Sequence, residues 1–163
     1  MSADDPTWPE GVARHAFDTL GSTNAYATSL APGLNGPAWV IAGQQTEGRG
    51  RRGRPWQSPA GNFYGSLIFR PDGPPDQVAL YSFVAALALH ETCAGLTDLP
   101  QVFALKWPND VLLNGGKLAG ILLESAGQGG RVGHLVIGIG VNLIAAPPPE
   151  AVEPGAVPPV SLL

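Results

Sequence analysis

The sequence predicts an α+β fold, a mainly antiparallel mixed sheet with helices packed on one side. The first observation is the segment 102–144, where short apolar stretches alternate with short turns, as in a strand meander. The second is the segment 77–96, whose helical periodicity predicts a long core helix. Large apolar residues recur in it at positions i, i+3, i+4 and i+7 and are expected to face the core: Leu80, Phe83, Val84 and Leu87.

The other elements follow from apolar runs and the turn residues between them. Ser22, Thr23 or Asn24 can cap the first helix, because each side chain can accept a hydrogen bond from a free backbone amide. The expected bounds are 12–20 for the first strand, 24–31 for the first helix, 38–45 and 61–70 for the next two strands, and 102–107, 111–113, 118–125 and 131–144 for the strands of the meander.

The two ends of the chain differ from the middle. Residues 1–11 are acidic and contain proline, and are expected to be a disordered lead-in. Residues 12–163 are expected to form one domain, which is long enough to bury a core. Within it, the stretch 147–160 is rich in proline and is expected to form neither regular helix nor sheet.

Composition restricts the class of protein. The net charge of −4 does not suggest a general nucleic-acid-binding protein, which usually has a basic surface. Cys93 is the only cysteine, so an internal disulfide is excluded and a reducing compartment is expected. The N-terminus lacks the pattern of a signal peptide, and no segment is read as a membrane span. We therefore expect a cytoplasmic protein without a membrane partner.

The stretch 48-GRGRRG-53 concentrates positive charge in a chain with few charged residues. Arg49, Arg51, Arg52 and Arg54 are four of the nine Lys and Arg residues, so the expected partner is a local anion. The spacing fits a dinucleotide-binding turn, but a strand rather than a helix is expected to follow. A P-loop is excluded, because no Gly-Lys-Ser/Thr follows. An RGG-like nucleic-acid segment and a solvated surface loop remain as alternatives.

Three further segments carry polar residues or glycines between apolar strands. The turn at 108–110 brings Asn109 and Asp110 together, although Asn-Asp after proline is also ordinary turn chemistry. Lys117 opens a strand that contains Gly120, and a strand-edge lysine can equally serve to prevent aggregation. The segment 137-IGIGVN-142 places two glycines on one strand face, which suits either a flat ligand or close packing.

In order and spacing, four stretches resemble the signature of the biotin protein ligases: 22-STN-24, 44-QQTEGRGRRGRPW-56, 105-LKWPNDVLLNGGKLAGIL-122 and 137-IGIGVN-142. The resemblance extends over about residues 14–144. Lipoate ligases and octanoyl transferases share the fold that it implies. The pairing of the arginine motif with Lys-Trp-Pro-Asn-Asp is the specific part of the signature.

The resemblance also implies a role for each matching residue. The implied biotin-binding residues are Ser22, Thr23, Asn24, Gln45, Gly48, Arg49, Arg51, Lys117, Gly120 and Gly138, and the implied catalytic residues among them are Lys117, Arg51 and Arg49. The implied nucleotide-binding residues are Arg51, Arg52, Arg54, Trp56, Asn109 and Asn142, and Asp110 is the implied Mg²⁺ ligand.

The activity that the resemblance implies is ATP-dependent biotinylation of one lysine on a biotin carboxyl carrier protein, through biotinyl-5′-AMP, with ATP, Mg²⁺ and biotin as cofactors and substrates. Arginine, lysine and Mg²⁺ suit this reaction, because a carboxylate must meet a phosphate and both are negative. The alternatives are a lipoyl or octanoyl ligase and a non-catalytic biotin- or adenylate-binding module.

Some members of the family carry modules that are not expected in this chain. The lead-in is too short for an N-terminal DNA-binding domain, and the sequence stops before the family's C-terminal helices and β-barrel domain. No nucleic-acid partner is therefore expected. The carrier protein and the oligomeric state, with a homodimer among the options, do not follow from the sequence. The arginine segment, with four like charges, is expected to be mobile when empty and ordered by the adenylate.

Overall fold

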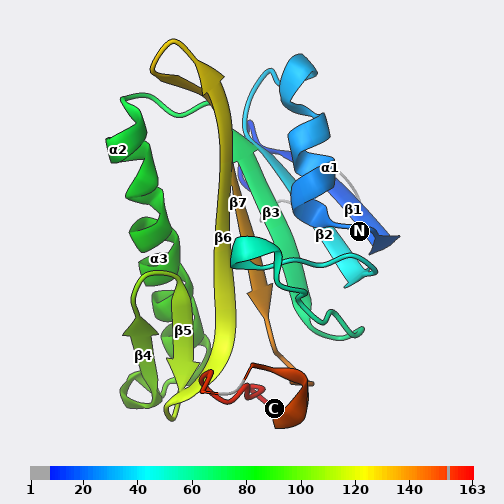
Figure 1. Cartoon of the computed structure of the whole chain (residues 1–163), viewed down its shortest axis with the longest axis vertical. Coiled ribbons are helices and arrows are strands. Elements are labelled where there is room, and N and C mark those ends of the chain that lie inside the picture. The colour runs from blue at the N-terminus through cyan, green and yellow to red at the C-terminus, as the bar shows by residue number, and fades with distance from the viewer. Residues whose placement is uncertain (1–7, 154) are drawn as a thin grey trace.

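A computed structural model describes residues 8–153 and 155–163, in which seven strands form one mixed sheet (Figure 1). The strand order is β1-β2-β3-β7-β6-β5-β4, with β1 and β2 parallel and the other pairs antiparallel. This confirms the predicted α+β class and the meander. The bounds are β1 (Ala13–Leu20), β2 (Ala38–Gln45), β3 (Phe63–Phe69), β4 (Phe103–Lys106), β5 (Asp110–Leu113), β6 (Gly116–Gln128) and β7 (Arg131–Val141).

Helix α1 (Thr23–Ser29) begins at the cap that the sequence predicts. Ser22 is extended, with φ −151°, and its hydroxyl accepts a hydrogen bond from the backbone amide of Ala25 at 3.3 Å. Ala27 packs in one cluster with Val40 of β2 and Val136 of β7. This cluster fixes the N-terminus of α1 against the middle of the sheet.

Helices α2 (Pro75–Ala79) and α3 (Tyr81–Thr97) cover the other face of the sheet. Leu135 and Ile137 of β7 pack with Val78 and Ala86, whereas the intervening Val136 packs with α1. Figure 1 accordingly shows α1 in front of β2 and β3, and β4 and β5 in front of α3. The predicted packing of helices on one side is therefore corrected, because alternate side chains of one strand point to opposite faces.

The apolar stripe predicted to bury α3 instead faces outward. Leu80 is 55% exposed and Val84 59% exposed, and the smaller Ala86 and Cys93 contact the sheet. The prediction is wrong because the helix is apolar on nearly every side, so periodicity does not select a buried face. By length and composition, Pro75–Thr97 is also apolar enough to cross a membrane, although in this fold one side of it packs on strands.

The tail after β7 returns along the sheet and contributes backbone hydrogen bonds. The Lys117 amide donates to the carbonyl of Pro158 at 2.8 Å, and the Val160 amide donates to the Lys117 carbonyl at 3.0 Å. The Leu162 amide similarly donates to the carbonyl of Asn142 at 3.0 Å. The proline-rich tail therefore forms one strand-like bridge, at Lys117 and Pro159, where no sheet pairing was expected.

The start of the chain differs in part from the predicted lead-in. Residues 1–7 of that lead-in lie outside the described residues. Residues 8–11 form a turn, in which the Trp8 indole donates to the Val12 carbonyl at 2.7 Å. The Arg14 guanidinium lies 4.9 Å from the centre of the Trp8 ring. These contacts order the last residues before β1.

Candidate functional site

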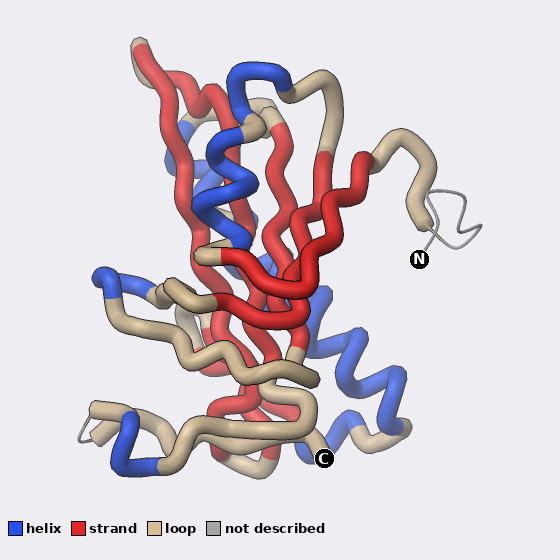
Figure 2. The backbone as a smooth tube through the Cα atoms, turned by 90° about the vertical axis from the view of Figure 1, so that its right-hand side faces the viewer, coloured by secondary structure: helices blue, strands red, loops and turns tan. Residues whose placement is uncertain are grey.

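A cavity of about 510 Å³ lies on the α1 face of the sheet. Its walls come from the N-terminus of α1, the first half of β6, the end of β7, the turn between β4 and β5, the arginine segment 49–54, and the tail between Pro147 and Pro159. Figure 2 shows the loops before β3 and after β7 projecting from the same side of the sheet. Segments separated by about a hundred residues thus share one site, of a size that suits a small molecule.

Glycines form the floor of this cavity. Gly120 and Gly140 are paired across β6 and β7, and the Trp56 indole lies directly over both. A Cβ atom at Gly140 would lie 2.6 Å from Trp56 Nε1, and one at Gly120 would lie 3.1 Å from Trp56 Cζ3. A Cβ at Gly138 would overlap the side-chain amide of Asn24. The same-face glycines therefore make room for an indole and an amide that themselves line the cavity.

Polar side chains that are largely buried form the wall next to α1. Gln45 Oε1 accepts from the Thr23 backbone amide at 2.8 Å and lies 3.0 Å from the Thr23 hydroxyl. The Ser66 hydroxyl lies 2.8 Å from the Thr23 hydroxyl and donates to Asn24 Oδ1 at 2.6 Å. Ser66 is fully buried, and Thr23 and Asn24 are 4% exposed. Such a fixed set of donors and acceptors suits a neutral polar ligand.

The arginine segment lies over this wall and contacts three different parts of the chain. Arg49 pairs with Glu124 of β6 at 3.1 Å, and Arg51 donates to Asn109 Oδ1 at 3.2 Å. Arg54 pairs with Glu153 of the tail at 2.8 Å. The segment is therefore closed over the cavity here, and its order without ligand remains a prediction.

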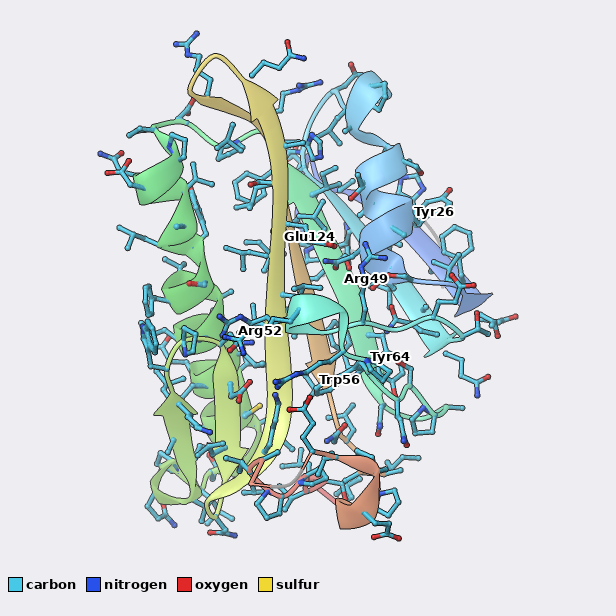
Figure 3. All side chains as sticks on the ribbon, viewed as in Figure 1. Tyr26, Arg49, Arg52, Trp56, Tyr64 and Glu124 are labelled. Atoms are coloured by element: carbon cyan, nitrogen blue, oxygen red, sulfur yellow. The ribbon has the colours of Figure 1, made fainter. Side chains whose placement is uncertain are left out.

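Arg52 differs from the other three arginines in its backbone. Its φ of 59° is left-handed, which is uncommon for a residue with a side chain. Figure 3 shows the Arg52 side chain directed toward the α3 side of β6, away from Arg49. The side chain nevertheless lines the cavity, as its predicted nucleotide role requires.

Lys117 and Asp110 form an ion pair in the lining of the cavity. Lys117 Nζ lies 2.8 Å from Asp110 Oδ1 and 5.6 Å from the centre of the Trp56 ring. The lysine is 28% exposed and the aspartate 15%, so water screens this pair only partly. The ammonium is thereby held within reach of a ligand in the cavity.

Asp110 could serve as a ligand of the implied Mg²⁺, but it would supply only one carboxylate group. Among the described residues, no group of three or more His, Cys, Asp or Glu side chains could hold a metal ion. Mg²⁺ commonly binds through one or two carboxylates together with substrate phosphates and water. The residues therefore suit an ion that arrives with a nucleotide.

The structure brings nearly all of the predicted site residues to one cavity. Those that line it are Ser22, Thr23, Asn24, Gln45, Arg49, Arg51, Arg52, Arg54, Trp56, Asn109, Asp110, Lys117, Gly120, Gly138 and Asn142. Asn142 is 1% exposed, and its Oδ1 finds no hydrogen-bond partner among the described residues.

Gly48 is the one predicted site residue that does not line the cavity. A Cβ there would lie 2.5 Å from the Trp56 carbonyl and 2.7 Å from the Ser58 hydroxyl. Gly48 therefore lets the two ends of the arginine segment approach each other, and the Trp56 amide donates to the Gly48 carbonyl at 2.8 Å.

Sequence reasoning missed four polar residues that hold the site together. Glu124 and Glu153 pair with arginines, and Ser58 and Ser66 hydrogen-bond to the residues of the polar wall. One feature of the sequence could have indicated Glu124, because it is a charged residue on the same predicted strand as Lys117 and Gly120. No such feature indicated the serines, because their partners in the polar wall lie 13 to 43 positions away in the sequence.

Within the part of the chain that the structure describes, the two groups with displaced pKa values lie outside the cavity wall. Burial raises the pKa of Tyr64, with hydrogen bonds from Asn62 and Ser58 acting in the opposite direction. Burial also raises the pKa of the Cys93 thiol. Both changes favour the neutral form, so neither group is prepared to act as a nucleophile.

The family model of the biotin/lipoate A/B protein ligases matches residues 17–142. The chain belongs to this family. The match runs from β1 to the residue after β7, and so includes the cavity floor, the arginine segment and the polar wall. The resemblance seen in the sequence motifs is thereby confirmed.

The individual proteins reported next, which are similar to this chain, are biotin ligases. Over 142 residues the chain is 61% identical to a biotin–acetyl-CoA-carboxylase ligase of Paracoccus denitrificans, covering 86% of this chain and 59% of that protein. A biotin protein ligase of Leishmania major, solved with biotinyl-5-AMP, has a TM-score of 0.73 at 30% identity, over 86% of this chain and 60% of that one. A ligase of Aquifex aeolicus, solved with biotin and ATP, has a TM-score of 0.68 at 28% identity, over 94% and 60%.

The chain thus spans about 59% of the length of its Paracoccus relative. The fold and the family follow from these comparisons. The activity, the substrates and the partners of the chain are treated below as proposals.

Proposed function

We propose that this chain forms the acyl-adenylate site of a biotin–protein ligase. The observation that carries the proposal is the convergence of Arg49, Arg51 and Lys117 on a cavity that also has a neutral polar wall. The cations suit a carboxylate and a phosphate, and the wall suits the uncharged ureido ring of biotin. The relative from Paracoccus, at 61% identity, supports biotin as the acid.

The chemistry consists of two displacements. A biotin carboxylate oxygen attacks the α-phosphorus of ATP, so that a P–O bond forms and the bond to pyrophosphate breaks. The amine of a carrier lysine then attacks the acyl carbon, loses a proton and releases AMP. Neither step needs a nucleophile from the protein.

The residues of the cavity contribute charge and alignment. Lys117 faces the cavity beside Trp56, where its ammonium can neutralise the attacking carboxylate and the α-phosphate. Arg51 lies next to Asn109 at the nucleotide end, and Arg49 lies beside the polar wall. Closure of the arginine segment also excludes water, which protects the mixed anhydride from hydrolysis.

Two residues are assigned to the nucleotide and its ion. Asn142 presents an unpaired carbonyl oxygen that can accept a hydrogen bond from an adenine amino group. Asp110 is assigned to Mg²⁺, which when bound neutralises phosphate charge. Because Asp110 is paired with Lys117, binding of the ion and placement of the lysine are expected to influence each other.

Two further properties are proposed, the partner and the location. The partner is a biotin carboxyl carrier domain, as the name of the Paracoccus relative suggests. The location is cytoplasmic, because one buried cysteine suits a reducing compartment.

Pyrophosphate release with different acids tests the proposal. The chain is incubated with MgATP and biotin, lipoate or octanoate, and a carrier domain is then weighed by mass spectrometry. We expect release with biotin and a biotin-sized mass gain. Release with lipoate or octanoate but not with biotin would make the substrate assignment wrong. Tight biotin binding in calorimetry without any release would favour a non-catalytic binding module.

A further inference from the structure

Glu124 has two partners that belong to different parts of the site. Both of its carboxylate oxygens lie within reach of Arg49 Nη2, at 3.2 and 3.1 Å. Its Oε2 also accepts from Asn24 Nδ2 at 2.8 Å. Figure 3 shows Glu124 and Arg49 extending toward each other, from β6 and from the arginine segment. One carboxylate thus connects that segment to the start of α1.

The connection continues through the polar wall. The Ser66 hydroxyl lies 2.6 Å from Asn24 Oδ1 and 2.8 Å from the Thr23 hydroxyl. The Thr23 hydroxyl donates in turn to Gln45 Oε1 at 3.0 Å. The Thr23 backbone amide also donates to Gln45 Oε1. Asn24 fits in this position because Gly138 has no Cβ. The wall is therefore linked to Glu124 by hydrogen bonds among largely buried side chains.

The same chain of contacts reaches the far end of the arginine segment. Gln45 Nε2 donates to the Ser58 hydroxyl at 3.0 Å, and Ser58 donates to the Trp56 carbonyl at 3.1 Å. The path that starts at Arg49 therefore ends at Trp56. Arg49 at the start of the segment and Trp56, two residues after its end, are thus tied to a single network, which passes along the predicted biotin-binding residues.

We propose that Glu124 is a positioning residue, which holds the arginine segment closed by fixing Arg49 against Asn24. Its kinetic consequences rest on the ligase function proposed above. Because Glu124 uses only Nη2 of Arg49, the remaining N–H groups of the guanidinium stay free to meet a ligand. Glu124 also offsets the charge of Arg49 while the segment is empty. A ligand that contacts Thr23 or Gln45 would act on the same network that holds the segment.

Limited trypsin digestion tests this without relying on activity. Arg49, Arg51 and Arg52 are trypsin sites within the segment, whereas Arg54 is protected by Pro55. Glu124→Gln keeps an acceptor for Asn24 but removes the charge that holds Arg49. Without ligand, we expect this variant to be cut in the segment about 2- to 5-fold faster than wild type, the range for loss of one partly exposed ion pair. Arg49→Gln should accelerate cutting at the remaining arginines similarly.

Controls separate positioning from general destabilisation. Glu91→Gln makes the same chemical change on the exposed surface of α3 and should leave the cutting rate unchanged. Unfolding temperatures of all variants show whether any acceleration is global. The double variant Glu124→Gln/Arg49→Gln should be cut at its remaining sites no faster than Arg49→Gln, because the two changes remove the same contact.

Adenylate retention is the second readout. We expect Glu124→Gln to release biotinyl-5′-AMP faster than wild type, again by about 2- to 5-fold, and to raise KM more than it lowers kcat. Digestion and release both at wild-type rates would overturn the role of Glu124. If wild type forms no adenylate with any acid, the proposed function fails, and the digestion of the empty protein still decides the inference.

Discussion

The two faces of β6 and β7 have different surroundings, a helical core on one side and the cavity on the other. On one face, Leu135 and Ile137 pack with α2 and α3 in an apolar cluster. On the other, Gly138 and Gly140 alternate with them and lie under Asn24 and Trp56. Neighbouring residues of one strand therefore belong to the core and to the cavity in turn. Stability and binding should be separable by comparing substitutions at Leu135 or Ile137 with substitutions at Gly138 or Gly140.

The largest effect is expected at the charged end of the cavity. Lys117→Ala should lower the rate of biotin-dependent pyrophosphate release by about 100-fold or more, because a preorganised cation is lost. The unfolding temperature should change little, since a partly exposed ion pair adds little stability. Steady-state rates and thermal unfolding measure the two effects. Turnover that remains unchanged would remove Lys117 from the mechanism.

Two glycine substitutions compare the cavity face of the sheet with helix α3. Gly138→Ala would force the Asn24 amide out of its network, and we expect biotin affinity to fall by about tenfold or more, as for a disrupted buried hydrogen-bond set. Calorimetric titration measures this.

Gly95→Ala in α3 is the matched control. A Cβ there meets nothing within 4 Å, so the change should stabilise the helix by up to about 1 kcal/mol and leave biotin binding intact. Equal affinities in the two variants would mean that Gly138 does not contribute to the site.

A core substitution on the helical face should show the reverse pattern. Leu135 is 1% exposed and packs with Val78 and Ile121. Leu135→Ala should lower the free energy of unfolding by about 2–5 kcal/mol, through lost burial and a residual cavity. Denaturant titration measures the loss. The activity of the folded fraction should match wild type, and a comparable loss of activity would show that the two faces are not independent.

A smaller effect is expected from the arginine segment. Arg51→Gly removes the hydrogen bond to Asn109 and a charge at the nucleotide end of the cavity. We expect biotinyl-5′-AMP to leak from the site several-fold faster, by loss of a charge-assisted contact, with little change in folding. Trapping of the released adenylate measures the leak. A leak equal to that of wild type would count against the assigned role.

The smallest effect concerns Cys93, on the helical face. Burial raises its pKa above the ordinary value of 9.0, so the thiol stays protonated and should react slowly with iodoacetamide. The folded state holds the thiol pKa above its unfolded value, so the neutral thiol's contribution to the free energy of unfolding is fully present below the unfolded pKa. This contribution is lost as the pH rises above about 9. Alkylation rates and unfolding at several pH values test both statements. Rapid alkylation of the folded protein at pH 8 would contradict them.

Local patterns in the sequence predicted the succession of strands and helices along the chain, Ser22 as one of three candidate caps, and most cavity residues. They failed for α3, where the small Ala86 and Cys93 face the sheet, because a helix that is apolar all round has no preferred face. They also missed Ser66 and Glu124. The function of those residues depends on partners about 40 to 100 positions away, which only the folded chain brings together.

Hydrogen exchange with and without biotinyl-5′-AMP tests whether the ligand binds on the α1 face of the sheet. At labelling times short enough for local opening alone, we expect slower exchange in residues 45–56, 118–122 and 138–142 when the ligand is bound. Residues 81–97 of α3 should exchange as they do in the empty protein. Protection confined to α3, or none in the arginine segment, would contradict the assignment of the α1 face as the binding face.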